Sequence, residues 1–303
     1  MPRELIRLSA EIGGHELRAD ISTVGASIQG LWVDGMPLVR GSGMAEPAMT
    51  SGVVLVPWPN RVRDAQWPLD GKTQHLEVTE PAAGNAIHGL LADTEYSVVR
   101  SDRDRLVLTA RVEQPPGYPF DLETDVEFAL VASGIECRIE VRNRGVRAAP
   151  VAVGVHPYVR LGSASPDDLT LAIEAARALP LGDDNFPLAS IDVQGTPFDL
   201  RGGVPLASAP RHACFTGLRA EDGRVRLRML GQDASVEVWG DSRFRWAQLY
   251  LTDDFPGLAP GEFAIALEPM TAPPDALNSG TDLHWLVPGR RWRRTWGISL
   301  SAA

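Results

Sequence analysis

Short runs in which apolar and polar residues alternate, each closed by turn residues, repeat along most of the chain. Because alternate side chains of a strand point to opposite faces, these runs predict antiparallel strands with one buried face. The predicted strands are residues 4–9, 16–22, 28–33, 53–56, 66–67, 75–78, 105–113, 123–131, 135–142, 224–230, 235–239, 245–251, 263–267 and 296–300. Helical periodicity is nearly absent, and the best candidate is one turn at residues 275–278. The pattern therefore predicts an all-β chain with very little helix.

Composition supports this fold class. The chain of 303 residues contains 29 glycines and 24 prolines, which interrupt it too often for long helices. Residues 179–211 are rich in proline, glycine and aspartate, and they predict a segment dominated by loops. The sequence has no internal repeat, low-complexity tract or charged linker, so we expect a single domain over residues 1–303.

The charge of the chain narrows the class of partner. Its formal net charge is −10 at pH 7 and its pI is near 5.1, whereas nucleic acids and anionic membranes bind basic surfaces. No apolar run approaches the ~20 residues that span a bilayer, and no secretory segment precedes Cys137 and Cys214. We therefore expect a cytoplasmic protein with reduced thiols. The sequence does not exclude a disulfide between the two cysteines. Its partner should be a small molecule, and neither a nucleic acid nor a membrane.

Residues 289–296 (GRRWRRTW) are a local exception to the acidic character of the chain, since arginines alternate with Trp292 and Trp296. Aromatic and cationic side chains in such an arrangement can stack bases or hold phosphate. The same alternation is typical of a half-buried strand, and we favour a solvated terminal strand as its interpretation.

Two ionisable residues occupy the same kind of position, at the end of an apolar run and directly before a proline. His156 follows PVAVGV and precedes Pro157, and Glu268 follows FAIAL and precedes Pro269. Proline removes an amide donor and favours an extended backbone at the residue before it, so each strand should end there and present the side chain at a rim. Each residue alone also fits a structural role, the histidine in a core hydrogen bond and the glutamate in a salt bridge.

Four motifs in the order NRVRDAQW, NAIHGLL, GVHPY and LEPMTAPPDALNSG resemble the aldose 1-epimerase (galactose mutarotase) family, closest to its bacterial branch. They are spread from about residue 50 to the C-terminus. The resemblance implies a large antiparallel β-supersandwich with a sugar cleft on one face. It also implies an isomerase that interconverts the α and β anomers of an aldose.

Carried over residue by residue, the resemblance makes Glu268 the general base and His156 the general acid. The residues expected to bind substrate are Asn60, Arg61, Asn85, His88, Tyr158 and His212. Of these, Arg61 and His88 would contact sugar hydroxyls and the ring oxygen. The family usually has an aspartate that holds two sugar hydroxyls, and its best local match in RHACF is His212. This departure leaves the sugar preference open.

Mutarotation requires little beyond these side chains. A base takes the proton of the anomeric hydroxyl and an acid protonates the ring oxygen, each contributing on the order of 10²- to 10⁴-fold. We expect Glu268 to be ionised and His156 protonated in the active form. Arg61 can stabilise charge that develops on oxygen. No cofactor and no metal is expected.

Three alternatives stay open. His88, His156 and Glu268 have the composition of a metal site, although no close spacing of histidines supports one. The second alternative is a non-catalytic carbohydrate-binding protein on the same scaffold. The third is a mutarotase of an anionic (phosphorylated or sulfonated) sugar, for which Arg61, Arg63 and residues 224–228 supply cations. Arginines at period two in residues 224–228 are, however, typical of one solvated strand face. The sequence leaves open the sugar, the anomer and whether the protein is a monomer or a homodimer.

Overall fold

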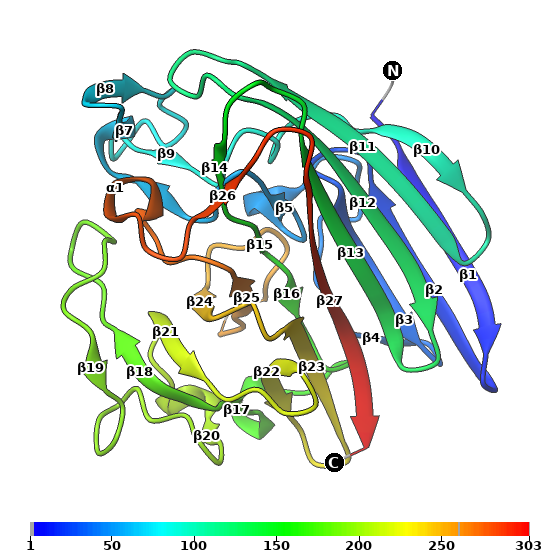
Figure 1. Ribbon diagram of the computed structural model, residues 1–303. Helices are drawn as coiled ribbons and strands as arrows, with labels where there is room; N and C mark the ends of the chain where they lie inside the picture. The colour runs from blue at the N-terminus through cyan, green and yellow to red at the C-terminus, as the bar shows by residue number, and fades with distance from the viewer. Residues whose placement is uncertain (1–2, 260, 303) are drawn as a thin grey trace.

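The computed structural model describes residues 3–259 and 261–302, and strands dominate it (Figure 1). Within those residues, nine strands form one antiparallel sheet, the large sheet, in the order β10-β11-β12-β13-β27-β23-β22-β17-β20. Their bounds are β10 Ser97–Ser101, β11 Arg105–Glu113, β12 Asp121–Val131, β13 Gly134–Asn143, β17 Thr170–Ile173, β20 Val204–Pro205, β22 Arg224–Leu230, β23 Ala234–Asp241 and β27 Arg291–Ala302. The C-terminal strand β27 pairs with β13 and β23, so the end of the chain joins the two halves of this sheet.

The large sheet has one buried face and one solvent face. Along β12 every second residue is buried, from Leu122 to Leu130, and the residues between them are partly exposed. On the solvent face of β22 and β23, Arg226 and Arg228 form ion pairs with Glu237 at 3.2 and 3.0 Å. The arginines of residues 224–228 therefore form one solvated strand face, as the period-two pattern predicted.

Two smaller sheets pack on the buried face of the large sheet. The N-terminal sheet has the order β1-β2-β3-β4 and the bounds β1 Leu5–Ile12, β2 His15–Ser22, β3 Ser27–Val33 and β4 Met36–Pro37. The second, which we call the site sheet, has the order β19-β18-β21-β24-β25-β15-β5, with β16 also paired to β25. Its bounds are β5 Val54–Leu55, β15 Gly154–Val155, β16 Tyr158–Val159, β18 Ala175–Leu179, β19 Ile191–Asp192, β21 His212–Leu218, β24 Trp246–Thr252 and β25 Ala264–Met270.

Contacts between elements define the layers. Strands β1 and β2 contact β12, β3 contacts β13, and β25 of the site sheet contacts β23. Figure 1 shows the same arrangement, with β1 to β3 beside β10 to β13 and the site sheet towards the other end of the molecule. The chain is thus an antiparallel β-supersandwich, in agreement with the expected fold class. None of the described helices is long and apolar enough to cross a membrane.

Short elements complete the described part of the chain. The strand pairs are β6 Arg61–Val62 with β9 Ala86–Ile87, β7 Gln66–Leu69 with β8 Lys72–His75, and β14 Ala149–Val151 with β26 His284–Leu286. The helical turns are α1 Ala276–Ser279 and the 3-10 turns Ala48–Thr50, Arg63–Ala65, Pro166–Asp168 and Leu206–Ser208. The single helical turn predicted at residues 275–278 is therefore confirmed within one residue.

The structure corrects several predicted bounds. The strand predicted at residues 53–56 shrinks to Val54–Leu55, because its neighbours Val53 and Val56 bond instead to loop segments. The strand predicted at residues 296–300 lengthens to Arg291–Ala302. The loop-dominated segment 179–211 contains short strands that edge the two larger sheets. Both cysteines are buried and unbridged in the described chain.

Candidate active site

Strand β25 carries Glu268 on the face that points away from the large sheet. Ile265 and Leu267 of this strand belong to the main core. Ala264 and Ala266 pack in a separate cluster with Tyr158. Because side chains alternate along a strand, Glu268 shares the face of the two alanines. The apolar run FAIAL therefore anchors the strand and leaves the carboxyl group on the outer face of the site sheet.

Cross-strand register adds three polar residues to the same face. Gln248 of β24 lies opposite Glu268, and Tyr250 lies opposite Ala266. His212 of β21 in turn lies opposite Tyr250, and their rings are 5.0 Å apart between centroids. Directly opposed residues of antiparallel strands project on one side of the sheet. Glu268 thus stands among polar and aromatic side chains.

His156 lies between β15 and β16, where the predicted strand end before proline is confirmed. Its amide donates to Val53 at 3.1 Å and its carbonyl accepts from Gly52 at 2.8 Å, which fixes the backbone on both sides. Its ring contacts the edge of His88 at 5.2 Å between centroids and Tyr158 at the same distance. Its Nε2 lies 3.4 Å from Oε1 of Glu268. The two residues before proline that the sequence singled out therefore form a pair. The strand end predicted at Glu268 is wrong, however, because β25 continues through Pro269 to Met270.

This pair faces a cavity of about 320 Å³. Seven of the eight predicted site residues line it: Asn60, Arg61, His88, His156, Tyr158, His212 and Glu268. Five lining residues were not singled out by the sequence analysis: Met49, Thr50, Glu80, Ile87 and Tyr250. The described structure thus brings together residues from the Asn-Arg, NAIHG, HPY and LEP motifs at one place.

Burial sets the protonation of the pair. Glu268 is 2% exposed, and loss of hydration raises its pKa to about 8, with Arg61 opposing the shift. Burial likewise lowers the pKa of His156 to about 4, and the neighbouring His212 and Arg61 act in the same direction. At neutral pH the glutamate of the free protein is therefore protonated and the histidine neutral, because both groups lie out of contact with bulk water. The opposite protonation was expected of the active form and stays a prediction.

Several polar atoms of the site lack partners among the described residues. They are Oε2 of Glu268, Nδ1 of His156, Nδ1 of His88 and both amide atoms of Gln248. Buried polar groups in native proteins are nearly always hydrogen-bonded, so a concentration of free ones at a cavity indicates a polar ligand. Gln248 does not itself line the cavity, and it lies beside Glu268 through the pairing of β24 with β25.

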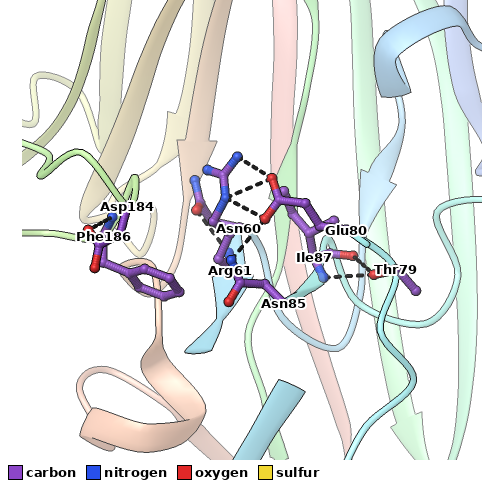
Figure 2. A network of polar contacts seen from close by, with 8 residues as sticks. All are labelled: Asn60, Arg61, Thr79, Glu80, Asn85, Ile87, Asp184 and Phe186. Carbon is purple, nitrogen blue, oxygen red and sulfur yellow. Dashed lines mark hydrogen bonds and ion pairs between the residues drawn. The ribbon is translucent and has the colours of Figure 1, made fainter. Parts of the chain in front are cut away.

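Arg61 is held by the partly buried carboxylate of Glu80 (Figure 2). Its Nε and Nη2 donate to Glu80 at 2.7–3.1 Å, and Asn85 donates to the same carboxylate at 3.0 Å. Burial alone would raise the pKa of Glu80, but these hydrogen bonds from Arg61 and Asn85 lower it below its usual value. The carboxylate is therefore ionised and fixes the guanidinium at the cavity wall.

Asn85 does not line the cavity, contrary to the expectation that it binds substrate. Its Oδ1 accepts from the amide of Asp64 at 3.1 Å, and its Nδ2 is used by Glu80. Both ends of the side chain are engaged behind the carboxylate, as Figure 2 shows for the contact with Glu80. The structure thus makes Asn85 a positioning residue for Glu80 and, through it, for Arg61.

Four described residues that line the cavity have positive φ: Met49, Thr50, Asn60 and His88. Asn60 has φ of 58° and His88 has φ of 63°. The amide of His88 donates to the carbonyl of Asn60 at 3.0 Å, and Oδ1 of Asn60 accepts from Arg61 at 2.8 Å. Non-glycine residues in this region cluster at functional sites, where the surroundings hold them. The β6–β9 pair thereby brings the Asn-Arg and NAIHG motifs side by side.

Arg63, two residues after Arg61, has a different environment. Its guanidinium pairs with Asp184 at 2.8 Å and lies over the Phe186 ring at 3.9 Å from the centroid, and its side chain is 46% exposed.

As to the metal alternative, no three side chains of His, Cys, Asp and Glu in residues 3–259 and 261–302 are arranged to hold a metal ion. The cavity holds a carboxyl group and an imidazole ring 3.4 Å apart, with hydrogen-bonding groups around them.

Known proteins resemble this chain in sequence and in fold. The sequence profile of the aldose 1-epimerase family matches residues 8–299. The uncharacterized protein YihR of Escherichia coli K12 is 29% identical over 293 residues, which cover 96% of this chain and 92% of YihR. A putative aldose 1-epimerase of Escherichia coli K12 has a similar structure, with a TM-score of 0.82 at 22% identity over 99% of this chain and 100% of that chain.

A second solved structure, the GalM/aldose epimerase homologue from C. elegans, gives a TM-score of 0.83 at 20% identity, with 100% of both chains covered. These likenesses show the galactose mutarotase-like fold. The family profile, in addition, matches nearly the whole sequence. The chain therefore belongs to the aldose 1-epimerase family.

Proposed function

We propose that the protein is a mutarotase, which interconverts the α and β anomers of an aldose by opening and closing the sugar ring. The observation that carries the proposal is the pair of His156 and Glu268, whose Nε2 and Oε1 lie 3.4 Å apart at the cavity. One group of such a pair can accept a proton while the other donates one. Family membership is consistent with this activity.

The proton count of the pair suits the reaction. Between pH values of about 4 and about 8 the pair holds one proton, which resides on Glu268 in the empty cavity. A bound sugar donates a hydrogen bond from its anomeric hydroxyl to the carboxyl group, and this contact favours the ionised form. The proton then passes to His156, whose ring nitrogen is adjacent. Sugar binding thus converts the neutral pair into a base and an acid.

Ring opening follows from this state. Glu268 takes the proton of the anomeric hydroxyl, and His156 gives its proton to the ring oxygen as the bond between that oxygen and the anomeric carbon breaks. The open-chain aldehyde rotates about the bond to its anomeric carbon and recloses on the other face. The two protons return in the reverse sense, so no atom or electron is gained or lost. Each of the two groups contributes on the order of 10²- to 10⁴-fold.

Surrounding side chains bind and orient the sugar. Glu80 accepts hydrogen bonds from Nε and Nη2 of Arg61. Nη1 donates to no described residue, so this donor can bind a sugar oxygen. Burial keeps the pKa of His88 well below its usual value, so its ring is neutral and can donate or accept. The free amide of Gln248 lies behind the cavity lining, opposite Glu268, and can hydrogen-bond the carboxyl group rather than the sugar.

A neutral aldose fits this cavity best. Among its described lining residues, Arg61 is the only lysine or arginine, and Glu80 neutralises it. Burial lowers the pKa of His212 to about 4, so this ring is also neutral near pH 7. At the place of the family's usual aspartate it presents a neutral group to a sugar hydroxyl. The anionic-sugar alternative stays in the experimental comparison.

The experiment is a panel of neutral and anionic aldoses followed by NMR exchange spectroscopy of the two anomers, with a chelator present throughout. The proposal predicts exchange faster than in buffer for at least one neutral aldose. Exchange at the buffer rate for every sugar would contradict it. Saturable binding of an aldose without faster exchange would instead establish the non-catalytic carbohydrate-binding alternative.

A further inference from the structure

A second cavity lies near the start of β27. Trp292 and Arg294 of the arginine-rich segment, which the proposed reaction does not use, line it. Its volume is about 410 Å³, and it shares no lining residue with the sugar cavity in the described structure. Its titratable lining residues are Arg243, Arg245, Asp282, His284 and Arg294. Three arginines and a neutral histidine thus face one carboxylate, in a protein whose net charge is −10.

Alternation along β27 divides the arginines of this segment between two environments. Arg291 and Arg293 point to the solvent face, where both bind Glu140. Trp292 and Arg294 share the face of the buried Trp296, but they lie at the end of the strand and line the cavity. The prediction of a strand in this segment is therefore confirmed. The alternation along it also directs the side chain of Arg294 towards the second cavity.

The positive charge of this cavity is not compensated within it. Asp282 is used by Arg245 at 3.0 Å and by the indole of Trp246 at 2.8 Å. The guanidinium of Arg243 forms no ion pair or hydrogen bond with any described residue. Nε of Arg294 is buried without a partner in the same set, and its side chain is only 14% exposed.

Arg294 does have one carboxylate behind it, but that group is shared. Nη1 of Arg294 binds Asp241 at 3.1 Å, and Asp241 also accepts from the amides of Arg243 and Thr295 at 2.9 Å each. The pKa of Arg294 is nevertheless lowered, mainly by burial and also by Arg243. Burial, Arg294 and Arg243 likewise lower the pKa of His284. The charges of Arg243 and Arg294 therefore repel each other, and both favour the neutral form of His284.

We propose that this cavity is a second ligand site, which binds a small anion of the phosphate type through Arg243, Arg245 and Arg294. Planar guanidinium groups bind tetrahedral oxyanions through pairs of N–H donors, and these charge-assisted hydrogen bonds are among the strongest in proteins. A bound dianion would accept hydrogen bonds from Arg243 and Arg294 and offset the repulsion between these two arginines. The shared chemistry covers inorganic phosphate and the phosphate group of a small ester.

The test is a titration with inorganic phosphate, measured by calorimetry against sodium chloride of equal ionic strength, with glucose 6-phosphate as a second arm. Saturable binding of phosphate is expected. Arg243→Gln should weaken it about tenfold or more, since one charge-assisted donor is lost. Tighter binding of the ester than of phosphate would identify an esterified ligand, and equal or weaker binding would identify the free anion. Both of these results support the site.

Arg291→Gln is the matched control, because it removes an arginine of the same strand on the opposite face. Arg61→Ala tests whether phosphate enters the sugar cavity instead. The proposal predicts phosphate binding like that of the wild type in both variants. It is overturned if the wild type shows no saturable binding, if Arg243→Gln binds as the wild type does, or if Arg61→Ala alone abolishes binding. Thermal unfolding of each variant without phosphate verifies that it is folded.

Discussion

Glu268 and His156 show how one buried environment shifts the pKa values of two groups in opposite directions. Burial favours the neutral form of each, which moves the pKa of the carboxyl group up to about 8 and that of the imidazole down to about 4. Titratable groups whose pKa values are pushed apart in this way are typical of acid–base sites. The interval between the two values is the range in which the pair holds the single proton that ring opening needs.

Activity of the wild type should therefore follow a bell in pH. Below about 4 the pair gains a second proton and loses its base, and above about 8 it loses its last proton and its acid. Because the groups are coupled, both limbs belong to the pair rather than to one residue. Rates of anomer exchange from pH 3.5 to 9.5 measure the limbs. A flat profile over this range would contradict the account.

His156→Gln should change the shape of that profile as well as its height. The residual reaction uses water as the acid and needs only ionised Glu268, so the rate should rise with pH through a value near 8 and not fall again. The loss at neutral pH should be on the order of 10²-fold or more. A variant that keeps the descending alkaline limb would assign the acid role to another group, with His88 as the neighbour in contact.

Arg61 and Arg63 provide a comparison between two arginines on one short segment. Arg61 lines the cavity and is fixed by Glu80, whereas Arg63 is half exposed and pairs with Asp184. Arg61→Ala should lower kcat/KM about 100-fold, because a directed charge on a sugar oxygen is lost. Arg63→Ala should lower it less than about threefold, since an exposed ion pair contributes little. Equal losses in the two variants at equal folded yield would mean that Arg61 does not contact the sugar.

Among the elements, the short β6–β9 pair has the greatest influence on the site. It joins Arg61 to Ile87, and the chain then passes through His88 to Gly89, which forms a bridge with Val56. Gly89 has φ of 79°, and a Cβ atom there would lie 2.2 Å from the carbonyl oxygen of Val56. This glycine allows the two backbones to approach and so brings His88 against His156.

Gly89→Ala should therefore damage both stability and activity. We expect it to lower the free energy of unfolding by at least about 2 kcal/mol, from backbone strain plus the clash. Gly84→Ala is the matched control, because Gly84 has φ of 72° but no atom within 4 Å of the added Cβ. It should cost about 1 kcal/mol and leave kcat/KM nearly unchanged. Chemical denaturation and exchange rates compare them, and equal effects would show that the close approach at Gly89 is not needed.

Local pattern was enough to predict most strands, because alternation records which face of a strand is buried. Strand β12 illustrates this, with every second residue in the core. The strand end before Pro157 was visible in the same way, and β15 does end at Val155. The end predicted at Glu268 was wrong, because β25 continues through Pro269 to Met270. Glu80 also precedes a proline, Pro81, but it follows LEVT instead of an apolar run, so the pattern did not single it out.

The remainder depends on contacts between distant parts of the chain. The position of β27 between β13 and β23 is set by pairing over more than 150 residues on one side, as Cys137 with Trp296 shows. Gln248 and Tyr250 join the site only because β24 pairs with β25. The protonation of the pair could not be predicted either, since burial of two groups that are 112 residues apart in the chain (156 to 268) is a property of the folded protein.

In the molecule as a whole, the core and the sugar cavity lie on opposite faces of the site sheet. The large sheet buries one face under two smaller sheets and exposes an ion-paired face to water. The inner face of the site sheet completes that core, which leaves its outer face free for the sugar cavity. The second cavity lies where β27, β26 and the turn after β23 meet, and it shares no lining residue with the sugar cavity in the described structure. Substitutions at one cavity should therefore not alter binding at the other.

The most direct test of the central claim, that a buried carboxyl group on β25 drives ring opening, is exchange spectroscopy on Glu268→Gln with the best aldose of the panel. Glutamine preserves shape but cannot take the anomeric proton, so exchange should fall at least about 10³-fold while the aldose still binds. Glu136→Gln, which removes a carboxylate from the solvent face of the large sheet, should exchange at the rate of the wild type. Exchange in Glu268→Gln within a few-fold of the wild-type rate would contradict the account.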